Sequence, residues 1–112
     1  MMKRVVIWSK DAADELAEII SYIKNHSGKI TASNIYKKIT GKVNDASENA
    51  AGRRVAPLLK ELGIVDIHQI NVNPWVIYYR VENETMKIIS IIDGRRNLEE
   101  ILYKKITDGK LV

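Results

Sequence analysis

The apolar pattern of the chain is densest between residues 75 and 93, where two apolar runs flank a short polar segment. Trp75–Val81 has large apolar or aromatic side chains at both odd and even positions, which indicates a strand that is covered on both faces. Met86–Asp93 follows the same pattern, and Glu82–Thr85 is short enough for a hairpin loop. The sequence therefore predicts an antiparallel hairpin with a central strand, which the rest of the chain must cover.

Two amphipathic helices are predicted before this hairpin. Lys3–Trp8 has the composition of an opening strand, and Ser9 stands where a helix N-cap is expected. The first apolar stripe ends at Asn25–Gly28 and contains Ala12, Leu16, Ile19, Ile20 and Ile23. The second begins near Thr31 and contains Ala32, Ile35, Ile39, Val43 and Ala46. The short connection between them predicts an antiparallel helical hairpin.

Shorter elements are predicted on either side of the central hairpin. Three leucines after Pro57 predict a short helical turn, at positions 58, 59 and 62. The apolar parity changes within Ile64–Val72, which predicts a strand with a bulge or a twist near His68, and Asn73–Pro74 predicts a turn. A final helix that ends at Gly109 is predicted by Leu98, Ile101, Leu102 and Ile106.

The predicted order is strand, helix, helix, three antiparallel strands and helix, which is an α+β arrangement. We expect an N-terminal strand and a helical hairpin packed on a small, mainly antiparallel sheet, with a short C-terminal helix. Residues 1–112 are enough for one hydrophobic core, so a single domain is expected.

Composition narrows the classes of protein that the chain can belong to. There is no cysteine, which excludes disulfides and thiolate metal ligands, and the two histidines, His26 and His68, have no spaced ligand partner. We therefore expect no metal site and no cofactor. No apolar run approaches the roughly 20 residues that span a bilayer, and no signal-peptide pattern follows Lys3 and Arg4. A cytoplasmic protein is expected.

Positive charge is concentrated in one part of the chain. The net charge is +4, and residues 29–54 contain six basic and two acidic residues, so this segment carries the whole excess. Such a segment fits a nucleic acid or an acidic protein partner, and it also fits a solvated helix face followed by a basic loop.

Several other residues are candidates for binding or for structure. Arg95 and Arg96 stand where a strand gives way to a helix and could contact phosphates or carboxylates. Arg80 is expected to pair with Asp93 or Glu82. The aromatic residues of the central strand, including Trp75 and Tyr78, belong to the core unless part of the second sheet face stays open for a partner.

Five short motifs, which together extend over nearly the whole chain, resemble those of a known protein family in their order and spacing. They are Ser9-Lys-Asp-Ala12 with Leu16, Gly52-Arg-Arg, Pro57-Leu-Leu, Tyr79-Arg80-Val81 and Asp93-Gly-Arg-Arg96. In their order and spacing the chain resembles the RelE/ParE superfamily of toxins from bacterial type II toxin–antitoxin, or plasmid-stabilisation, systems. This resemblance implies a growth-inhibiting toxin that is held inactive by a cognate antitoxin.

Two activities compete within that superfamily. RelE-like toxins are ribosome-dependent endoribonucleases that cut mRNA, whereas ParE-like toxins poison DNA gyrase. RelE-like proteins have an arginine directly after the first aromatic residue of the central strand, and here Val76 follows Trp75. Arg96 matches an arginine that follows the last strand, but the tyrosine of the final helix aligns with Leu102, and only Tyr103 offers a phenol.

These departures favour a ParE-like, non-enzymatic toxin that binds gyrase. The alternative is a RelE-like nuclease with the ribosome and mRNA as partners, which would use Arg96 and Tyr103 and a lysine or arginine from the segment between Lys42 and Arg54. A non-toxic degenerate member of the family is a third hypothesis. A homodimer or a heterotetramer with the antitoxin is expected. The residues expected to bind the target or the antitoxin are Arg53, Arg54, Trp75, Tyr78, Arg95 and Arg96.

Overall fold

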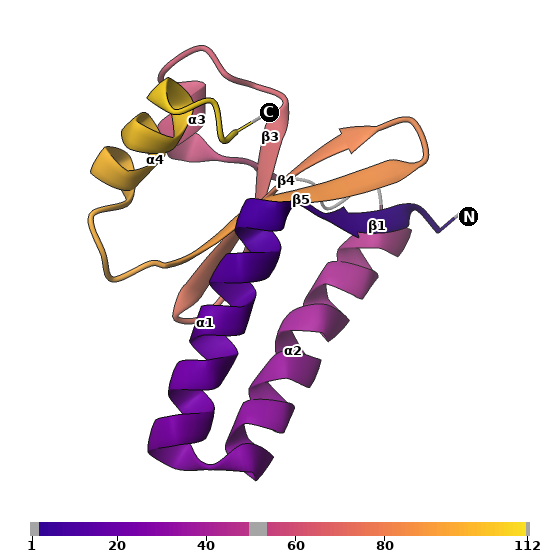
Figure 1. Ribbon diagram of the computed structural model, residues 1–112. Coiled ribbons are helices and arrows are strands. Elements are labelled where there is room, and N and C mark those ends of the chain that lie inside the picture. The colour runs from indigo at the N-terminus through magenta and orange to yellow at the C-terminus, as the bar shows by residue number, and fades with distance from the viewer. Residues whose placement is uncertain (1–2, 50–53, 112) are drawn as a thin grey trace.

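The computed structural model describes residues 3–49 and 54–111, and Figure 1 shows its helices and strands. In chain order the elements are β1 (Val5–Trp8), α1 (Lys10–Ser27), α2 (Lys29–Glu48), β2 (Arg54–Val55), α3 (Pro57–Lys60), β3 (Ile67–Val72), β4 (Trp75–Glu82), β5 (Thr85–Asp93) and α4 (Leu98–Thr107). The chain therefore has the predicted α+β arrangement.

The five strands form one sheet in the order β1-β5-β4-β3-β2, so β4 lies at its centre as predicted. The β2–β3, β3–β4 and β4–β5 pairs are antiparallel, and β1 pairs in parallel with β5. A parallel pair needs a long crossover between its strands, which the helical hairpin and the strands that follow it supply. The prediction of a mainly antiparallel sheet is confirmed.

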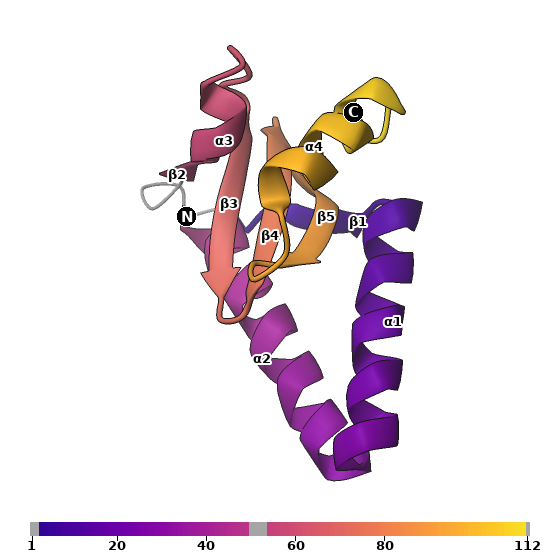
Figure 2. The same cartoon turned by 90° about the vertical axis from the view of Figure 1, so that its left-hand side faces the viewer.

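Each face of the sheet is covered by its own hydrophobic core. The α1–α2 hairpin covers one face, towards which β4 directs Ile77 and Tyr79. On the other face, α3 and α4 cover Val76 and Tyr78. Figure 2 shows the sheet between these layers, with the hairpin extending beyond it. The two covered faces explain why β4 is apolar at both parities.

The first helix begins as predicted. Ser9 is its N-cap, and the hydroxyl oxygen of Ser9 accepts a hydrogen bond from the backbone N–H of Ala12 at 3.1 Å. The second helix begins at Lys29, earlier than predicted, because Gly28 alone joins the two helices. Gly28 has φ +90°, a conformation that favours glycine, and it allows the sharp reversal into α2.

The predicted bulge near His68 is wrong. β3 pairs with β4 without interruption from Ile67 to Val72, and its apolar parity changes because both of its faces are covered. The irregularity lies one strand further, where Tyr78 pairs with Ser90 and Tyr79 pairs with Ile88, so that β5 has one extra residue. This bulge reverses the parity of β5 between its two ends.

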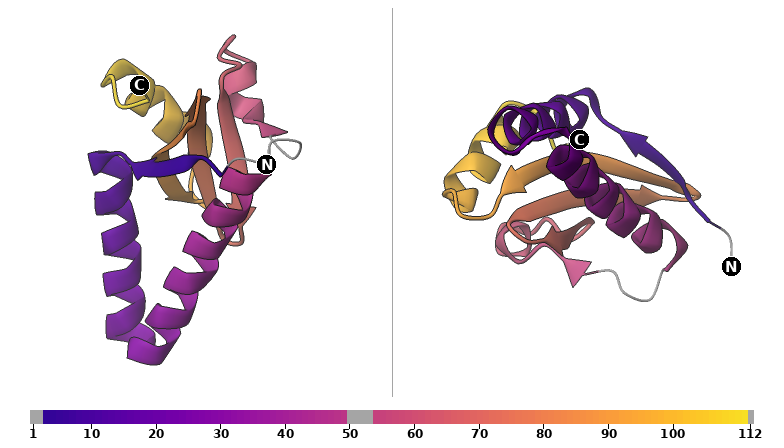
Figure 3. Two further views of the ribbon diagram at one scale, coloured as in Figure 1. Left: turned by 90° about the vertical axis from the view of Figure 1, so that its right-hand side faces the viewer. Right: turned by 90° about the horizontal axis from the view of Figure 1, so that it is seen from below.

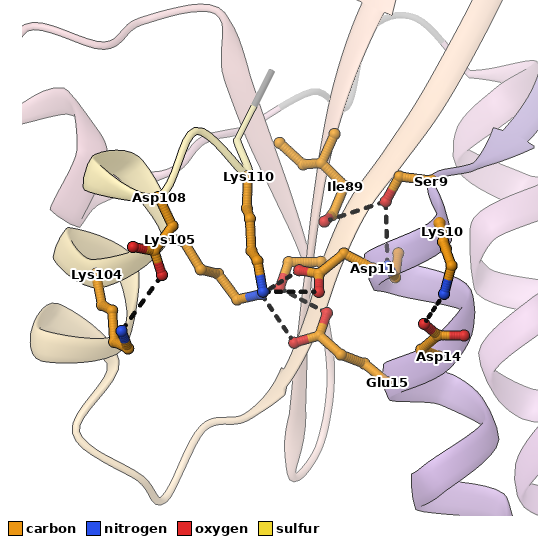
Figure 4. Close-up of polar contacts among 12 residues, drawn as sticks. Ser9, Lys10, Asp11, Asp14, Glu15, Ile89, Lys104, Lys105, Asp108 and Lys110 are labelled. Atoms are coloured by element: carbon orange, nitrogen blue, oxygen red, sulfur yellow. Dashed lines mark hydrogen bonds and ion pairs between the residues drawn. The ribbon is translucent and has the colours of Figure 1, made fainter.

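A cluster of ion pairs holds α4 against α1 and β5 (Figure 4). Lys105 is 9% exposed and forms an ion pair with Asp11, and its Nζ lies 3.1 Å from Glu15 Oε2. Glu15 Oε1 also accepts hydrogen bonds from Ser90 Oγ at 2.9 Å and from the backbone N–H of Ile91 at 3.2 Å. These contacts connect three elements that are far apart in the sequence.

Arg80 is paired, but neither with Asp93 nor with Glu82 as predicted. Its Nε lies 2.9 Å from Asp66 Oδ2, and its Nη2 donates to the backbone oxygen of Leu111 at 3.2 Å. The β3–β4 register places Arg80 opposite Ile67, the residue after Asp66, whereas Asp93 is at the other end of β5. Arg80 therefore fastens the C-terminal segment to the sheet.

Candidate partner-binding groove

An apolar groove lies where the helical hairpin extends past the end of the sheet. Its volume is about 570 Å³, and it opens between α1, α2, the β3–β4 turn and the β5–α4 connection. The lining side chains are mostly apolar, with two carboxylates and one guanidinium among them: Glu18, Ile19, Tyr22, Ile23, Ser27, Thr31, Ile35, Pro74, Trp75, Asp93 and Arg95. The hairpin protrudes in the same way in the left view of Figure 3.

The sheet end of the groove is a tight corner. Trp75 pairs with Asp93 across β4 and β5, and the backbone N–H of Gly94 donates to the Pro74 oxygen at 2.7 Å. A Cβ atom on Gly94 would lie 3.0 Å from that oxygen and 3.2 Å from Val76 Cγ2. Only glycine lets the two connections approach this closely, so Gly94 brings Trp75 and the following arginines to one place.

Arg95 is fixed by Asp93 at the rim of the groove. Its Nε and Nη2 lie 3.0 Å and 2.6 Å from the two carboxylate oxygens of Asp93, and its backbone N–H donates to Asp93 Oδ1 at 2.9 Å. These hydrogen bonds to Arg95 lower the pKa of Asp93 to about 2. Asp93 therefore remains ionised at neutral pH and orients the guanidinium of Arg95.

Arg96 differs from its neighbour. Its backbone N–H donates to the Asp93 oxygen at 3.1 Å, but its side chain forms no ion pair or hydrogen bond with residues 3–49 or 54–111. The two adjacent guanidiniums are therefore not equivalent. Arg95 is largely neutralised, whereas the exposed Arg96 can offer its full fork of donors to a carboxylate or a phosphate.

The structure brings together only some of the predicted binding residues. Trp75 and Arg95 line the groove, and Arg96 follows directly. Tyr78 is 1% exposed under α3 and α4, and burial raises its pKa to about 12, so it contributes to the core and presents no surface to a partner. Arg54 is exposed on β2, two strands away from β4, and Arg53 lies outside the described residues.

Four groove residues were not singled out from the sequence: Ile19, Tyr22, Ile23 and Ile35. The three isoleucines belong to the apolar stripes of α1 and α2, and Ile19 and Ile35 also pack partly against the core. The sequence carries no signal for their place in the groove, because a stripe residue looks the same whether or not a strand lies beneath it. Element length does not distinguish the two cases either, since β4 and β5, with eight and nine residues, are about as long as the two helices, at roughly 27 and 30 Å.

A second opening of about 560 Å³ lies on the other side of the hairpin, next to β1. It is also mainly apolar, with Trp8, Leu16, Ile20 and Tyr36 among its lining residues and Lys24 as the lining cation. No predicted binding residue lies there. The groove at Trp75 therefore remains the candidate site, because it combines an apolar surface with an oriented cation, Arg95, and the exposed Arg96 follows Arg95 directly in the chain.

The residues named for the nuclease alternative do not form a catalytic arrangement. Tyr103 is 43% exposed on α4 and shares a small depression with Asn97, Glu99 and Glu100. Two carboxylates beside the phenol would repel the extra negative charge of a phosphate under attack. Leu102 is 1% exposed and belongs to the core, so the preceding position offers no replacement.

Neither a metal site nor a membrane span is evident in the part of the chain that the structure describes. Residues 3–49 and 54–111 contain no group of three or more His, Asp or Glu side chains that could hold a metal ion. None of the helices in these ranges is both long and apolar enough to cross a membrane.

Comparison with known proteins gives a consistent result. A family model described as "ParE toxin of type II toxin-antitoxin system, parDE" matches residues 6–98. No curated protein matches the chain. A solved structure entitled "Chromosomal ParDE TA system from P. aeruginosa" is similar with a TM-score of 0.66 and 17% identity, over 81% of this chain and 96% of that one. At this identity the structural likeness supports the fold.

Proposed function

This chain belongs to the ParE toxin family of type II toxin–antitoxin systems, and from that premise we propose that it inhibits DNA gyrase by binding and is neutralised by a cognate antitoxin. The observation that carries the proposal is the family match over residues 6–98, which includes the groove and the Asp93–Arg96 corner. Binding alone is enough for such a toxin, because it needs only to favour the gyrase state in which DNA is cut.

Residues 3–49 and 54–111 do not form a nuclease constellation, and this supports gyrase over the ribosome as the target. Val76 and Leu102 are core residues at the two positions where RelE-like proteins have functional groups, and Tyr103 lies beside two glutamates. Of the positions compared with RelE-like proteins, only Arg96 has both the expected residue type and an exposed side chain. One free guanidinium can stabilise a charge, but RNA cleavage also needs a general base and a general acid.

We propose the groove at Trp75 as the docking site of the antitoxin. Its apolar side chains fit the apolar face of a partner segment, and Arg95 and Arg96 fit carboxylates that flank it. An antitoxin segment that folds as it binds would cover the exposed apolar stripe of the hairpin. The complex would be cytoplasmic, and a homodimer or a heterotetramer with the antitoxin remains our proposal for its assembly.

Expression in growing cells distinguishes the two targets. Brief induction of the intact chain should relax plasmid DNA and induce the DNA-damage response, while a reporter mRNA stays whole. Co-expression with the product of the adjacent gene should restore growth. Cleavage of the reporter within its codons, with plasmid supercoiling unchanged, would favour the RelE-like alternative. Growth that continues normally with the folded protein present would favour a degenerate family member.

The docking site can be tested separately from toxicity. Trp75→Ala removes the largest aromatic side chain of the groove and should weaken antitoxin binding by about 10-fold to 100-fold, in the range of an interface hot spot. Tyr103→Ala on α4 is the matched control, because it removes an exposed aromatic side chain outside the groove. Equal affinities for these two variants, measured by calorimetry, would place the antitoxin elsewhere.

A further inference from the structure

Most of the excess positive charge of the chain lies on α2 and β2. Residues 29–54 hold six of the 18 basic and two of the 14 acidic residues, which leaves twelve of each in the rest of the chain. Figures 2 and 3 show α2 and β2, which contain most of this segment, on the side away from α1 and α4. The rest of the chain is neutral, so any long-range electrostatic attraction comes from this side.

Basic residues elsewhere in the structure mostly have acidic partners, whereas those on α2 and β2 do not. Outside this segment the ion pairs are Lys10–Asp14, Arg80–Asp66, Arg95–Asp93, Lys104–Asp108, Lys105–Asp11, Lys105–Glu15 and Lys110–Asp11. No carboxylate among residues 3–49 and 54–111 pairs with Lys29, Lys37, Lys38, Lys42 or Arg54. In contrast, Glu48 of α2 is itself engaged, by Lys3 at 3.9 Å.

Three of these lysines form a compact group on the exposed surface of α2. Lys38 and Lys42 are four residues apart, which places them on neighbouring turns of one face, about 6 Å apart along the axis. Lys37 lies beside Lys38, and all three are exposed. Between Lys37 and Lys42 the only large apolar side chain is Ile39, which is fully buried. We call this group the α2 lysine face.

The α2 lysine face has the features of a phosphate-binding surface and lacks those of a protein interface. Protein partners are held mainly by aromatic and apolar side chains in desolvated pockets, and none is exposed between Lys37 and Lys42; the exposed Tyr36, one residue earlier, lines the opening beside β1. Contacts to the DNA backbone need only cations and small polar groups, at a spacing that need not be exact. We propose that the α2 lysine face, together with Arg54, contacts the phosphate backbone of duplex DNA.

This inference deepens the proposed function and rests on it in one respect, since in the cell the duplex would be the segment that gyrase holds. The groove at Trp75 and the α2 lysine face would then have separate tasks. The first binds the antitoxin through apolar contacts, and the second adds electrostatic affinity for the DNA beside the toxin's target. An antitoxin bound in the groove need not cover the lysine face.

The test measures binding of the purified chain to a fluorescent duplex of about 20 base pairs by anisotropy, between about 50 and 200 mM salt. The test variant carries Lys37→Gln, Lys38→Gln and Lys42→Gln. The control carries Lys10→Gln, Lys24→Gln and Lys104→Gln, which removes the same charge from α1 and α4. The test variant should bind at least about 10-fold more weakly at low salt, and its slope of log K against log salt should be shallower by about 2 to 3.

Three results would overturn the inference. The first is an equal loss of DNA affinity in both variants, which would reflect net charge alone. The second is tighter binding of single-stranded RNA than of the duplex. The third is an affinity for the antitoxin that falls while DNA binding does not change. A third variant with arginine at all three positions should bind duplex at least as well as the native chain, so a folding defect cannot imitate the expected loss.

A gyrase cleavage assay with the same proteins separates the inference from the proposed function. DNA cleavage with the native chain and the control, but less with the test variant, supports both. Equal cleavage by all proteins overturns the inference and leaves the proposed function standing. Duplex binding that depends on the three lysines, without any effect on gyrase, supports the DNA contact and contradicts gyrase as the target.

Discussion

Replacing Lys105 by methionine tests whether the buried ion pairs hold the C-terminal helix in place. Lys105 is 9% exposed and contacts both Asp11 and Glu15. Methionine keeps the length and the apolar stem of the side chain but removes the charge. The two carboxylates would then face each other with only the more exposed Lys110, 3.7 Å from Asp11 Oδ1, as a nearby cation.

The expected loss of stability follows from the burial of the cluster. Removing one partner of a buried ion pair costs about 3–5 kcal/mol. The side chains of Asp11 and Glu15 are 28% and 23% exposed, so water screens their charges. We therefore expect Lys105→Met to lower the free energy of unfolding by about 2–3 kcal/mol. For a domain of this size that corresponds to a fall in Tm of roughly 8–15 °C.

Urea denaturation followed by circular dichroism measures the effect, with Lys104→Met as the matched control. Lys104 is the preceding residue and pairs with Asp108 on the surface, so its loss should cost less than about 0.5 kcal/mol. Equal stability of the two variants would refute the argument that Lys105 holds α4.

The pH dependence adds an independent check on the same pair of variants. Burial raises the pKa of Asp11, but hydrogen bonds and charge from Lys105 and Lys110 outweigh it, so the pKa is lowered. A lowered pKa stabilises the fold above the unfolded value of about 3.9, and that contribution disappears as the pH falls through the folded value. The deficit of Lys105→Met should therefore be largest near pH 7 and shrink below about pH 4.

Other substitutions test the corner at Trp75. Gly94→Ala should cost about 1–3 kcal/mol in urea denaturation, because its Cβ would press on the Pro74 oxygen; Gly41→Ala, within α2 and with open space around it, should gain up to about 1 kcal/mol. A neutral Gly94→Ala would contradict the close approach. Asp93 loses its stabilising contribution as the pH falls from the unfolded pKa of about 3.9 to the folded pKa of about 2, so the stability of Asp93→Asn should depend less on pH over that range. An unchanged dependence of stability on pH would show that Asp93 is not coupled to Arg95. Arg96→Ala should leave stability within about 0.5 kcal/mol while lowering target or antitoxin affinity, whereas a large loss of stability would mean that Arg96 has a structural role.

Periodic patterns predicted most of the fold because they depend on local geometry. The apolar stripes of α1 and α2, the Ser9 cap and the two-sided strand β4 follow directly from the spacing of side chains along the chain. The bulge was misplaced because a change of parity in β3 has two causes, an extra residue or two covered faces. Distinguishing them requires the positions of α3 and α4.

The site was less predictable because it depends on where elements end relative to one another. Trp75, Arg95 and Arg96 could be named from their motif, but Ile19, Ile23 and Ile35 look the same in sequence whether a strand covers them or not. Tyr78 was expected in the core unless part of the second sheet face stayed open, and the packing of α4 closes that face over it. The partner of Arg80 depended on strand register in the same way.

The most direct measurement is a cleavage assay with purified gyrase, supercoiled plasmid and ATP, in which protein-linked linear DNA is scored with and without the chain. We expect linear DNA to accumulate with the chain and to disappear when the purified antitoxin is added. Absence of linear DNA, from a folded protein that stops growth in cells, would contradict gyrase as the target and direct attention to the ribosome.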